Sequence, residues 1–204
     1  MISRRTNYAL GFVAIAAVAG VVAWNVSSTP QQPRLPPAGD VSGLADTIKR
    51  ADRADPAAEY RLAHLYAGGS GIATDRKQAQ LWLERAAEHG NADAQYELGN
   101  ALREGAGMVQ DYERAARWIT LAAMSGHPEA QYALGQLYHI GVGVPADNVK
   151  AYVWFNLAAA QDVAGATVQR DVLLRALTPE QVLQAQAEAR RLSETGTTKP
   201  SASR

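Results

Sequence analysis

Small and apolar residues recur at steps of three and four along most of the chain, which is the spacing of one face of an α-helix. In residues 91–126, Ala94, Leu98 and Ala101 follow this spacing between polar positions. After a glycine-containing break the same spacing returns in a second set: Ala115, Trp118, Ile119, Ala122 and Ala123. The pattern predicts two helices joined by a short turn.

This helix pair is repeated three times at a fixed step. Trp82, Trp118 and Trp154 lie 36 residues apart. Further positions keep the same step: Tyr60, Tyr96 and Tyr132; Gly69, Gly105 and Gly141; Asp75, Asp111 and Asp147; Ala79, Ala115 and Ala151. A period of this length is typical of a stacked array, in which each unit buries its apolar face against the next. The sequence therefore predicts an all-α fold, an α-solenoid of helix-turn-helix repeats.

Glycine and aspartate mark the ends of the predicted helices. Gly105 and Gly107 can adopt positive φ without steric cost, which allows a tight reversal of the chain. Asp111 follows where its carboxylate can cap the next helix. Gly99 stands in mid-helix, where glycine lowers helix propensity. Its position therefore predicts the close approach of a second helix.

The third repeat shows the full set of recurring residues: Ala130, Leu134-Gly135, Tyr138, Gly141-Val142-Gly143-Val144, Asp147, Lys150-Ala151, Trp154 and Ala158-Ala159. This pattern resembles Sel1-like repeats, and the resemblance extends over all three units. The departures are Ala63, Leu102 and Asp162, where the pattern has Gly, Tyr and Gly. The resemblance implies antiparallel helix pairs in a right-handed superhelix, similar to tetratricopeptide repeats. It also implies an adaptor or scaffold role, often at bacterial envelopes, with no catalytic residue and no cofactor.

Both flanks of the repeats have features of terminal caps. Leu44, Ile48 and Ala51 have helical spacing before the first repeat. After the third repeat, Thr178 and Gln181 have the spacing of a capping box at the start of a helix. One apolar stripe then follows: Val182, Ala185, Ala189 and Leu192. A single apolar stripe with a polar outer face is what a capping helix requires.

These features divide the chain into eight parts. They are an N-terminal membrane anchor or signal segment (1–26), a Pro-rich linker (27–40), an N-capping helix (41–54), three repeats (55–90, 91–126 and 127–162), C-terminal capping helices (163–192) and a polar tail that we expect to be disordered (193–204).

The N-terminal segment has two possible interpretations. Residues 9–26 are apolar and uncharged, close to the minimum length for a membrane-spanning helix, and they follow Arg4 and Arg5. As an uncleaved anchor, this segment places the N-terminus in the cytoplasm and the repeats in the periplasm, at the inner membrane. As a cleavable signal, it releases the repeats into the periplasm or the medium. The anchor is the preferred interpretation, because Trp24 and Asn25 resemble an interfacial edge.

Composition narrows the possible functions. The formal net charge is zero, which argues against a general nucleic-acid binder. The chain contains no cysteine, and its four histidines do not have the spacing of metal ligands. Glu84, Glu88 and His89 are most simply an exposed helix face. The repeated tryptophans are expected in the core. We therefore expect neither catalysis nor a small-molecule substrate.

Positions that vary between repeats are the candidates for binding. The most variable row on the first helix of each repeat contains Ala57, Arg61, His64 and Gly68, then Asp93, Glu97, Asn100 and Glu104, then Glu129, Ala133, Gln136 and Ile140. Its polar members are the predicted partner-binding residues: Arg61, His64, Asp93, Glu97, Asn100, Glu104, Glu129 and Gln136. In related repeat folds such helices line the concave side, so we expect this row to face a groove.

The favoured function is a membrane-tethered module that binds a protein or peptide segment in that groove. The alternatives are a periplasmic module that binds peptidoglycan, or an activator of an enzyme. The sequence does not name the partner.

Overall fold

The computed structural model describes residues 42–68 and 72–196. The predicted membrane segment (9–26) and the Pro-rich linker lie outside these residues, as does Gly69. Within the described ranges, no helix has both the length and the apolar character needed to cross a bilayer.

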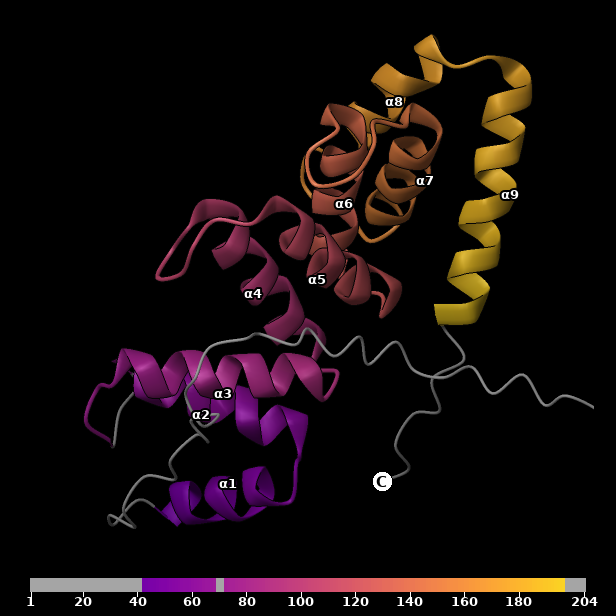
Figure 1. Ribbon diagram of the computed structural model, residues 1–204. Helices are drawn as coiled ribbons and strands as arrows, with labels where there is room; N and C mark the ends of the chain where they lie inside the picture. Colours follow the sequence, from indigo (N-terminus) through magenta and orange to yellow (C-terminus); the bar gives the residue numbers. More distant parts are fainter. Residues whose placement is uncertain (1–41, 69–71, 197–204) are drawn as a thin grey trace, which may run out of the picture. The chain divides into compact units, whose positions relative to one another are not determined.

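The described residues form nine α-helices and no strand (Figure 1). The helices are α1 (Ser42–Asp52), α2 (Pro56–Gly68), α3 (Arg76–Glu88), α4 (Ala92–Glu104), α5 (Tyr112–Met124), α6 (Pro128–Ile140), α7 (Asn148–Ala159), α8 (Ala166–Ala176) and α9 (Pro179–Gly196). The predicted all-α solenoid of helix pairs is confirmed.

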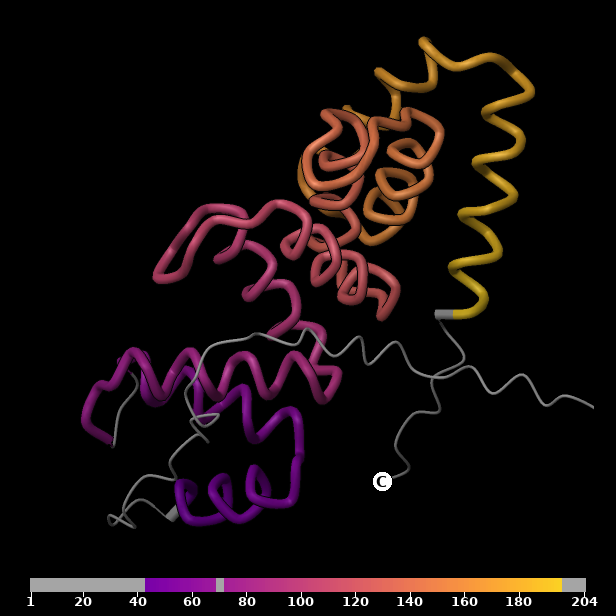
Figure 2. The backbone as a smooth tube through the Cα atoms, viewed as in Figure 1, coloured from indigo at the N-terminus to yellow at the C-terminus, as the bar shows by residue number. Residues whose placement is uncertain are grey.

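Each repeat is one helix pair, and each pair packs on the next. The pairs are α2 with α3, α4 with α5, and α6 with α7. The second helix of one repeat contacts the first helix of the following repeat, as α3 contacts α4 and α5 contacts α6. The backbone trace in Figure 2 shows the successive reversals of the chain that produce these pairs. Each repeat thereby buries apolar side chains both within its own pair and against its neighbour.

The turns inside the repeats use the predicted residues. Gly105 and Gly141 end the first helices of repeats 2 and 3 with left-handed backbone, at φ 71° and 81°. Asp111 caps α5, because its side chain accepts a hydrogen bond of 2.9 Å from the backbone N–H of Arg114. Asp75 and Asp147 cap α3 and α7 in the same way. The aspartate that recurs once in each repeat therefore marks the start of the second helix of that repeat.

Gly99 and Gly135 permit the closest approach between the helices of a pair. A Cβ atom added at Gly99 would lie 2.6 Å from Cγ1 of Ile119 on α5. A Cβ atom at Gly135 would lie 2.7 Å from the ring of Phe155 on α7. The predicted close approach is confirmed, and it explains why glycine is accepted in mid-helix despite its low propensity.

The two ends of the array are covered by additional helices. α1 packs against α2, and Leu44 and Ala51 are buried there. At the other end, the predicted capping box is confirmed: the backbone N–H of Thr178 donates to Gln181 Oε1 at 3.0 Å, and the N–H of Gln181 donates to Thr178 Oγ1 at 3.3 Å.

Two features of the C-terminal part differ from the expectation. α9 continues through residues 193–196, which we had assigned to the tail, and Thr195 Oγ1 there donates to the carbonyl of Arg191 at 3.2 Å. In addition, α9 does not complete a fourth pair with α8, because it packs along α7. Its predicted stripe makes this contact: Ala185 and Ala189 are buried, and Val182 and Leu192 pack beside them.

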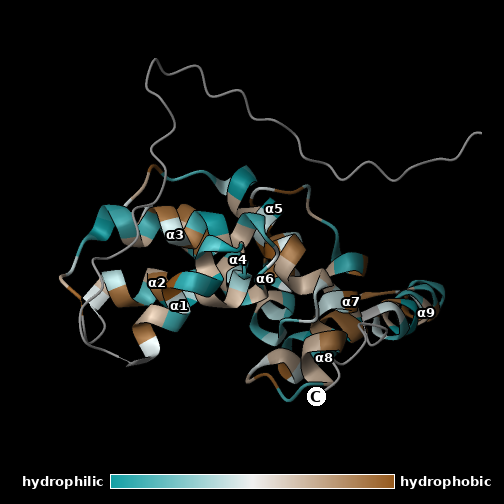
Figure 3. Ribbon diagram, turned by 90° about the horizontal axis from the view of Figure 1, so that it is seen from below, coloured by the Kyte–Doolittle hydropathy of each residue, from teal (hydrophilic) through white to brown (hydrophobic). Residues whose placement is uncertain are grey.

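The position of α9 explains the composition of α7. Tyr152, Val153 and Leu157 are buried there, although repeats 1 and 2 carry residues such as Gln80, Arg117 and Arg85 at the same positions. α7 contacts α6, α8 and α9, so it is apolar on nearly all sides. Figure 3 shows it as largely hydrophobic.

Gly99→Ala tests the close approach. We expect it to lower the free energy of unfolding by about 1–3 kcal/mol, because Ile119 must move to accept the new methyl group. The matched control is Gly43→Ala in α1, where a Cβ atom meets nothing within 4 Å. Urea unfolding followed by circular dichroism measures both variants. Equal stability of the two variants would contradict the packing described.

Ala185→Asp tests the docking of α9. Ala185 is fully buried against α7, so an aspartate there would place a charge in an apolar contact. We expect α9 to detach, with fast hydrogen exchange over residues 179–196 and along α7. Ala187→Asp, at an exposed position of the same helix, is the control and should exchange like the wild type. Slow exchange in both variants would show that α9 is held in another way.

Candidate protein-binding surface

The predicted binding residues form what we call the first-helix row. Arg61 and His64 lie on α2, four residues lie on α4, and Glu129 and Gln136 lie on α6. The side chains of Asp93, Glu104 and Glu129 are 61%, 62% and 59% exposed. The row therefore offers three solvent-exposed carboxylates from two consecutive repeats.

Part of the row also connects repeat 1 to repeat 2. Glu97 Oε1 lies 3.4 Å from Nε2 of His64, across the junction between α4 and α2. The Glu97 carboxylate also lies close enough to the hydroxyl of Tyr60 to influence its ionisation. Burial raises the pKa of the Tyr60 hydroxyl above its usual range, and the neighbouring charge of Glu97 raises it further. Glu97 thus contributes to the stacking of the repeats.

A second histidine stands at the junction of repeats 2 and 3. The Nε2 atom of His127 lies 3.4 Å from Oδ1 of Asp93. Its Nδ1 atom accepts a hydrogen bond of 3.2 Å from the N–H of Ala130 and caps α6. The ring also packs against Tyr96, with 4.7 Å between the ring centroids. Asp93 therefore touches the junction while most of its side chain remains exposed.

The remaining members of the row differ in their availability. Arg61 is exposed, and no ion pair of the described residues involves it. Among the described residues, Glu104 forms an ion pair with its neighbour Arg103, at 3.2 Å. Gln136 is half-buried, and the Oδ1 atom of Asn100 is buried without a hydrogen-bond partner. The carbonyl oxygen of Asn100 is therefore not exposed to solvent, and its role in binding stays a prediction.

Repeat 1 contains a buried charged cluster that the sequence pattern did not predict, which we call the polar node: Glu59, Arg85 and His89. Glu59 is fully buried. Its Oε2 atom is 2.7 Å from Nδ1 of His89, in hydrogen-bond geometry. Its Oε1 atom is 2.6 Å from Nε of Arg85, an ion-pair contact without hydrogen-bond geometry. His89 was expected on an exposed face with Glu84 and Glu88, but its ring nitrogen is bound to the node.

The equivalent position in the other repeats holds glutamine. Gln95 Nε2 donates to the carbonyl of Ala87 at 3.1 Å, and Gln131 Nε2 donates to the carbonyl of Ala123 at 3.3 Å. Each of these bonds connects a repeat to the one before it. The Oε1 atom of Gln131 also accepts a hydrogen bond of 2.8 Å from Nε2 of Gln161. Gln161 occupies the position in repeat 3 that His89 occupies in repeat 1. Glu59 follows only the capping helix α1, and it bonds within its own repeat.

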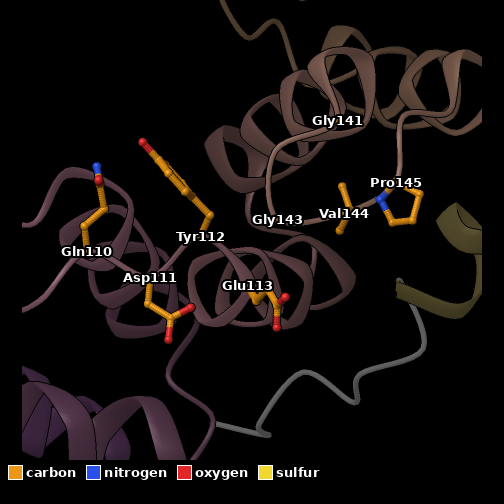
Figure 4. A pocket seen from close by; sticks show the side chains of 8 residues that line it. All are labelled: Gln110, Asp111, Tyr112, Glu113, Gly141, Gly143, Val144 and Pro145. Carbon is orange, nitrogen blue, oxygen red and sulfur yellow. The ribbon is translucent and has the colours of Figure 1, made fainter.

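A shallow depression lies between the start of α5 and the loop after α6 (Figure 4). Its lining comes from two segments: Gln110, Asp111, Tyr112 and Glu113, and Gly141, Gly143, Val144 and Pro145. Figure 4 shows Tyr112 and Asp111 pointing in different directions. A side chain at Gly143 would collide with the carbonyl group of Tyr112, so the loop rests directly on α5. The depression is therefore a packing seam between repeats 2 and 3, without convergent polar groups.

Glu59→Ala tests the polar node. It removes the shared partner of Arg85 and His89, and we expect the free energy of unfolding to fall by about 1.5–3 kcal/mol, the range for hydrogen bonds to charged groups. Both partners are about one-third exposed and can regain water, which keeps the loss near the lower end.

The double variant Glu59→Gln and His89→Gln is the matched control, since it copies the Gln131–Gln161 pair of repeat 3. Urea unfolding should show that it recovers most of the stability lost in Glu59→Ala. If Glu59→Ala is as stable as the wild type, the node does not support repeat 1.

The comparisons with known proteins agree with this architecture. The Sel1 repeat family matches three consecutive segments, at residues 56–91, 92–127 and 128–163. No curated protein is similar enough to match.

Several solved structures are similar to this chain, among them the following two. A Sel1 repeat protein from Oxalobacter formigenes is 36% identical, with a TM-score of 0.63, over 64% of this chain and 98% of that one. The protein c5321, described as a protective antigen of uropathogenic Escherichia coli with an SLR fold, is 30% identical, with a TM-score of 0.54, over 78% of this chain and 43% of that one.

The family matches extend over more than half of the chain, and the helix pairs have the same period as the matches. Sel1-repeat proteins generally mediate protein–protein interactions, and the family is typically a non-enzymatic interaction scaffold. The chain therefore belongs to the Sel1 repeat family.

Proposed function

We propose that this protein is a non-enzymatic adaptor that binds a segment of a partner protein along the first-helix row. The observation that carries the proposal is the exposure of Asp93, Glu104 and Glu129, about 60% for each side chain, on helices whose other faces are packed. Exposed carboxylates on the first helices of two consecutive repeats suit an extended or helical segment with basic side chains.

The proposal assigns different roles to the members of the row. Asp93, Glu104 and Glu129 are the primary contacts, with Arg61 at the edge toward repeat 1. Glu97 and His64 act mainly through the junction that they form, at 3.4 Å from each other. We also propose that the row faces the concave groove of the repeats, where a bound segment would touch several repeats at once.

For the location, we propose an inner-membrane anchor at residues 9–26, with the N-terminus cytoplasmic and the repeats periplasmic. Arg4 and Arg5 before the apolar segment support this orientation. The description of c5321 as a protective antigen supports an extracytoplasmic position for the repeats. The alternative within the same proposal is cleavage of the segment and release of the repeats.

The double variant Glu104→Lys and Glu129→Lys tests the binding row. We expect it to retain at least tenfold less crosslinked partner in a pull-down from membranes, since two attractive charge contacts become repulsive. Helicity should not change, because both side chains are mostly exposed. The melting temperature should fall only slightly, because the lysine at position 129 replaces a first-turn carboxylate that lies 3.4 Å from His127. Quantitative mass spectrometry of the captured partner gives the measurement.

Glu113→Lys is the control, since Glu113 is 80% exposed on α5 and lies outside the row. Unchanged capture by the double variant would refute the assignment of the row. Retention of the wild type on purified cell-wall sacculi, with no captured protein, would instead favour the peptidoglycan-binding alternative. The mass of the mature N-terminus decides between anchor and signal.

A further inference from the structure

The outer face of α8 is not covered by another helix of the described residues. α8 takes the position of a first helix in a fourth repeat, and Ala166 and Leu173 are buried on its inner side. In the three complete repeats a second helix packs on the first, but here α9 packs along α7 instead (Figure 1). As a result, the side chains of Val168, Val172 and Leu174 are 63%, 51% and 43% exposed.

The preceding repeat shows what this face normally contacts. Val168 and Leu174 are one period after Tyr132 and Tyr138 of α6, and Asp171 is one period after Gly135. Tyr132 packs against Phe155 of the second helix, with 5.5 Å between ring centroids, and Gly135 lies against the same ring. The exposed face of α8 therefore includes the face that a paired helix covers in a complete repeat. Val172 lies at the edge of this face, since it is one period after the half-buried Gln136.

We propose that a second copy of this chain covers this face, with the two α8 helices antiparallel about a two-fold axis near Val172. The charges on the face are self-complementary. Arg175 is exposed and takes part in no ion pair of the described ranges, and Asp171 is paired only with its neighbour Arg170 through Oδ1. In an antiparallel pair centred on Val172, Arg175 of each copy comes within one helical turn of Asp171 of the other.

The opposite end of the array does not fit this face equally well. The outward positions of α1 include Asp46 and Lys49, and Arg50 there is held by Asp55 at 2.7 Å. A head-to-tail contact between α1 and α8 would bury these charges against valines. The two-fold arrangement instead packs Val172 of one copy against Val172 of the other, and it forms a closed dimer.

The contact area sets the expected affinity. One face of an 11-residue helix buries less than the ~1,200 Å² that is typical of stable complexes, so we expect a transient dimer with a dissociation constant in the micromolar range or weaker. The association should therefore depend on concentration, and it should be sensitive to single charges.

Crosslinking of the full chain tests the position of the proposed two-fold axis near Val172. The wild type contains no cysteine, so Val172→Cys introduces a single thiol that lies next to its own copy in the proposed dimer. Under mild oxidation of the purified chain in detergent, which its apolar residues 9–26 require, we expect a disulfide-linked dimer. Val109→Cys is the control, since Val109 is an exposed valine (87%) in a loop of repeat 2, and it should remain monomeric. Equal crosslinking of the two variants, or none in either, would overturn the proposal.

Reversing the charges of Asp171 and Arg175 tests the proposed ion pairs between the two copies. Asp171→Arg alone and Arg175→Asp alone place like charges opposite each other in a symmetric dimer, so each should sediment as a monomer at concentrations at which the wild type associates. A mixture of the two variants restores both opposite-charge contacts and should associate again. Circular dichroism confirms that each variant is folded. Association of the single variants at wild-type strength, or failure of the mixture to associate, would contradict the antiparallel α8 contact.

Discussion

No helix pair in this protein can bury its apolar surface by itself, and this constraint determines most of the structure. Each pair closes at one point where the two backbones come close, at Gly99 in repeat 2 and Gly135 in repeat 3. The outer side of the pair then requires the next repeat, which contributes apolar side chains and a polar contact. The ends are the exception, because the array stops there. α1 covers one end, whereas at the other end α8 and α9 both pack on α7.

The polar contacts show how buried hydrogen-bonding groups are satisfied in a stacked array. Gln95 and Gln131 reach back to carbonyl groups at the end of the preceding second helix. Glu59 has no preceding repeat to reach, and it forms an ionic cluster with Arg85 and His89 instead. A buried carboxylate is costly unless it is paired, so the three residues of the node depend on one another.

The sequence predicted the features that recur with the period, because each of them follows from local geometry. Capping by Asp111, reversal at Gly105 and close approach at Gly99 were all predicted and confirmed. The docking of α9 was not predicted. Its stripe through Ala185 and Ala189 shows that one face is buried, but it does not identify the helix that receives it. The unusual apolar residues Tyr152 and Val153 on α7 were the available signal.

The candidate site was harder to predict than the fold. Variation between repeats identified surface positions. It could not distinguish a side chain that is available to bind a partner from one that contacts the neighbouring repeat. Glu97 belongs to the second kind, as its contacts with Tyr60 and His64 show. The node at Glu59 was missed because glutamate and glutamine differ only slightly in sequence comparison. Glutamate is charged and glutamine is not, and the neighbouring Arg85 and His89 make the charge acceptable in the interior.

The different solutions at Glu59 and Gln95 have a consequence for how such a protein changes length over generations. The middle repeat binds backward through a neutral amide, so a tandem copy of residues 92–127 would find a suitable carbonyl in the copy before it. The first repeat is self-contained at this position, because Glu59 pairs with Arg85 and His89 of the same repeat. A copy of it placed inside the array would keep this cluster, but it would leave the carbonyl of the preceding repeat without the amide donor that Gln95 supplies. Copies of the middle repeat are therefore better suited to lengthening the array than copies of the first.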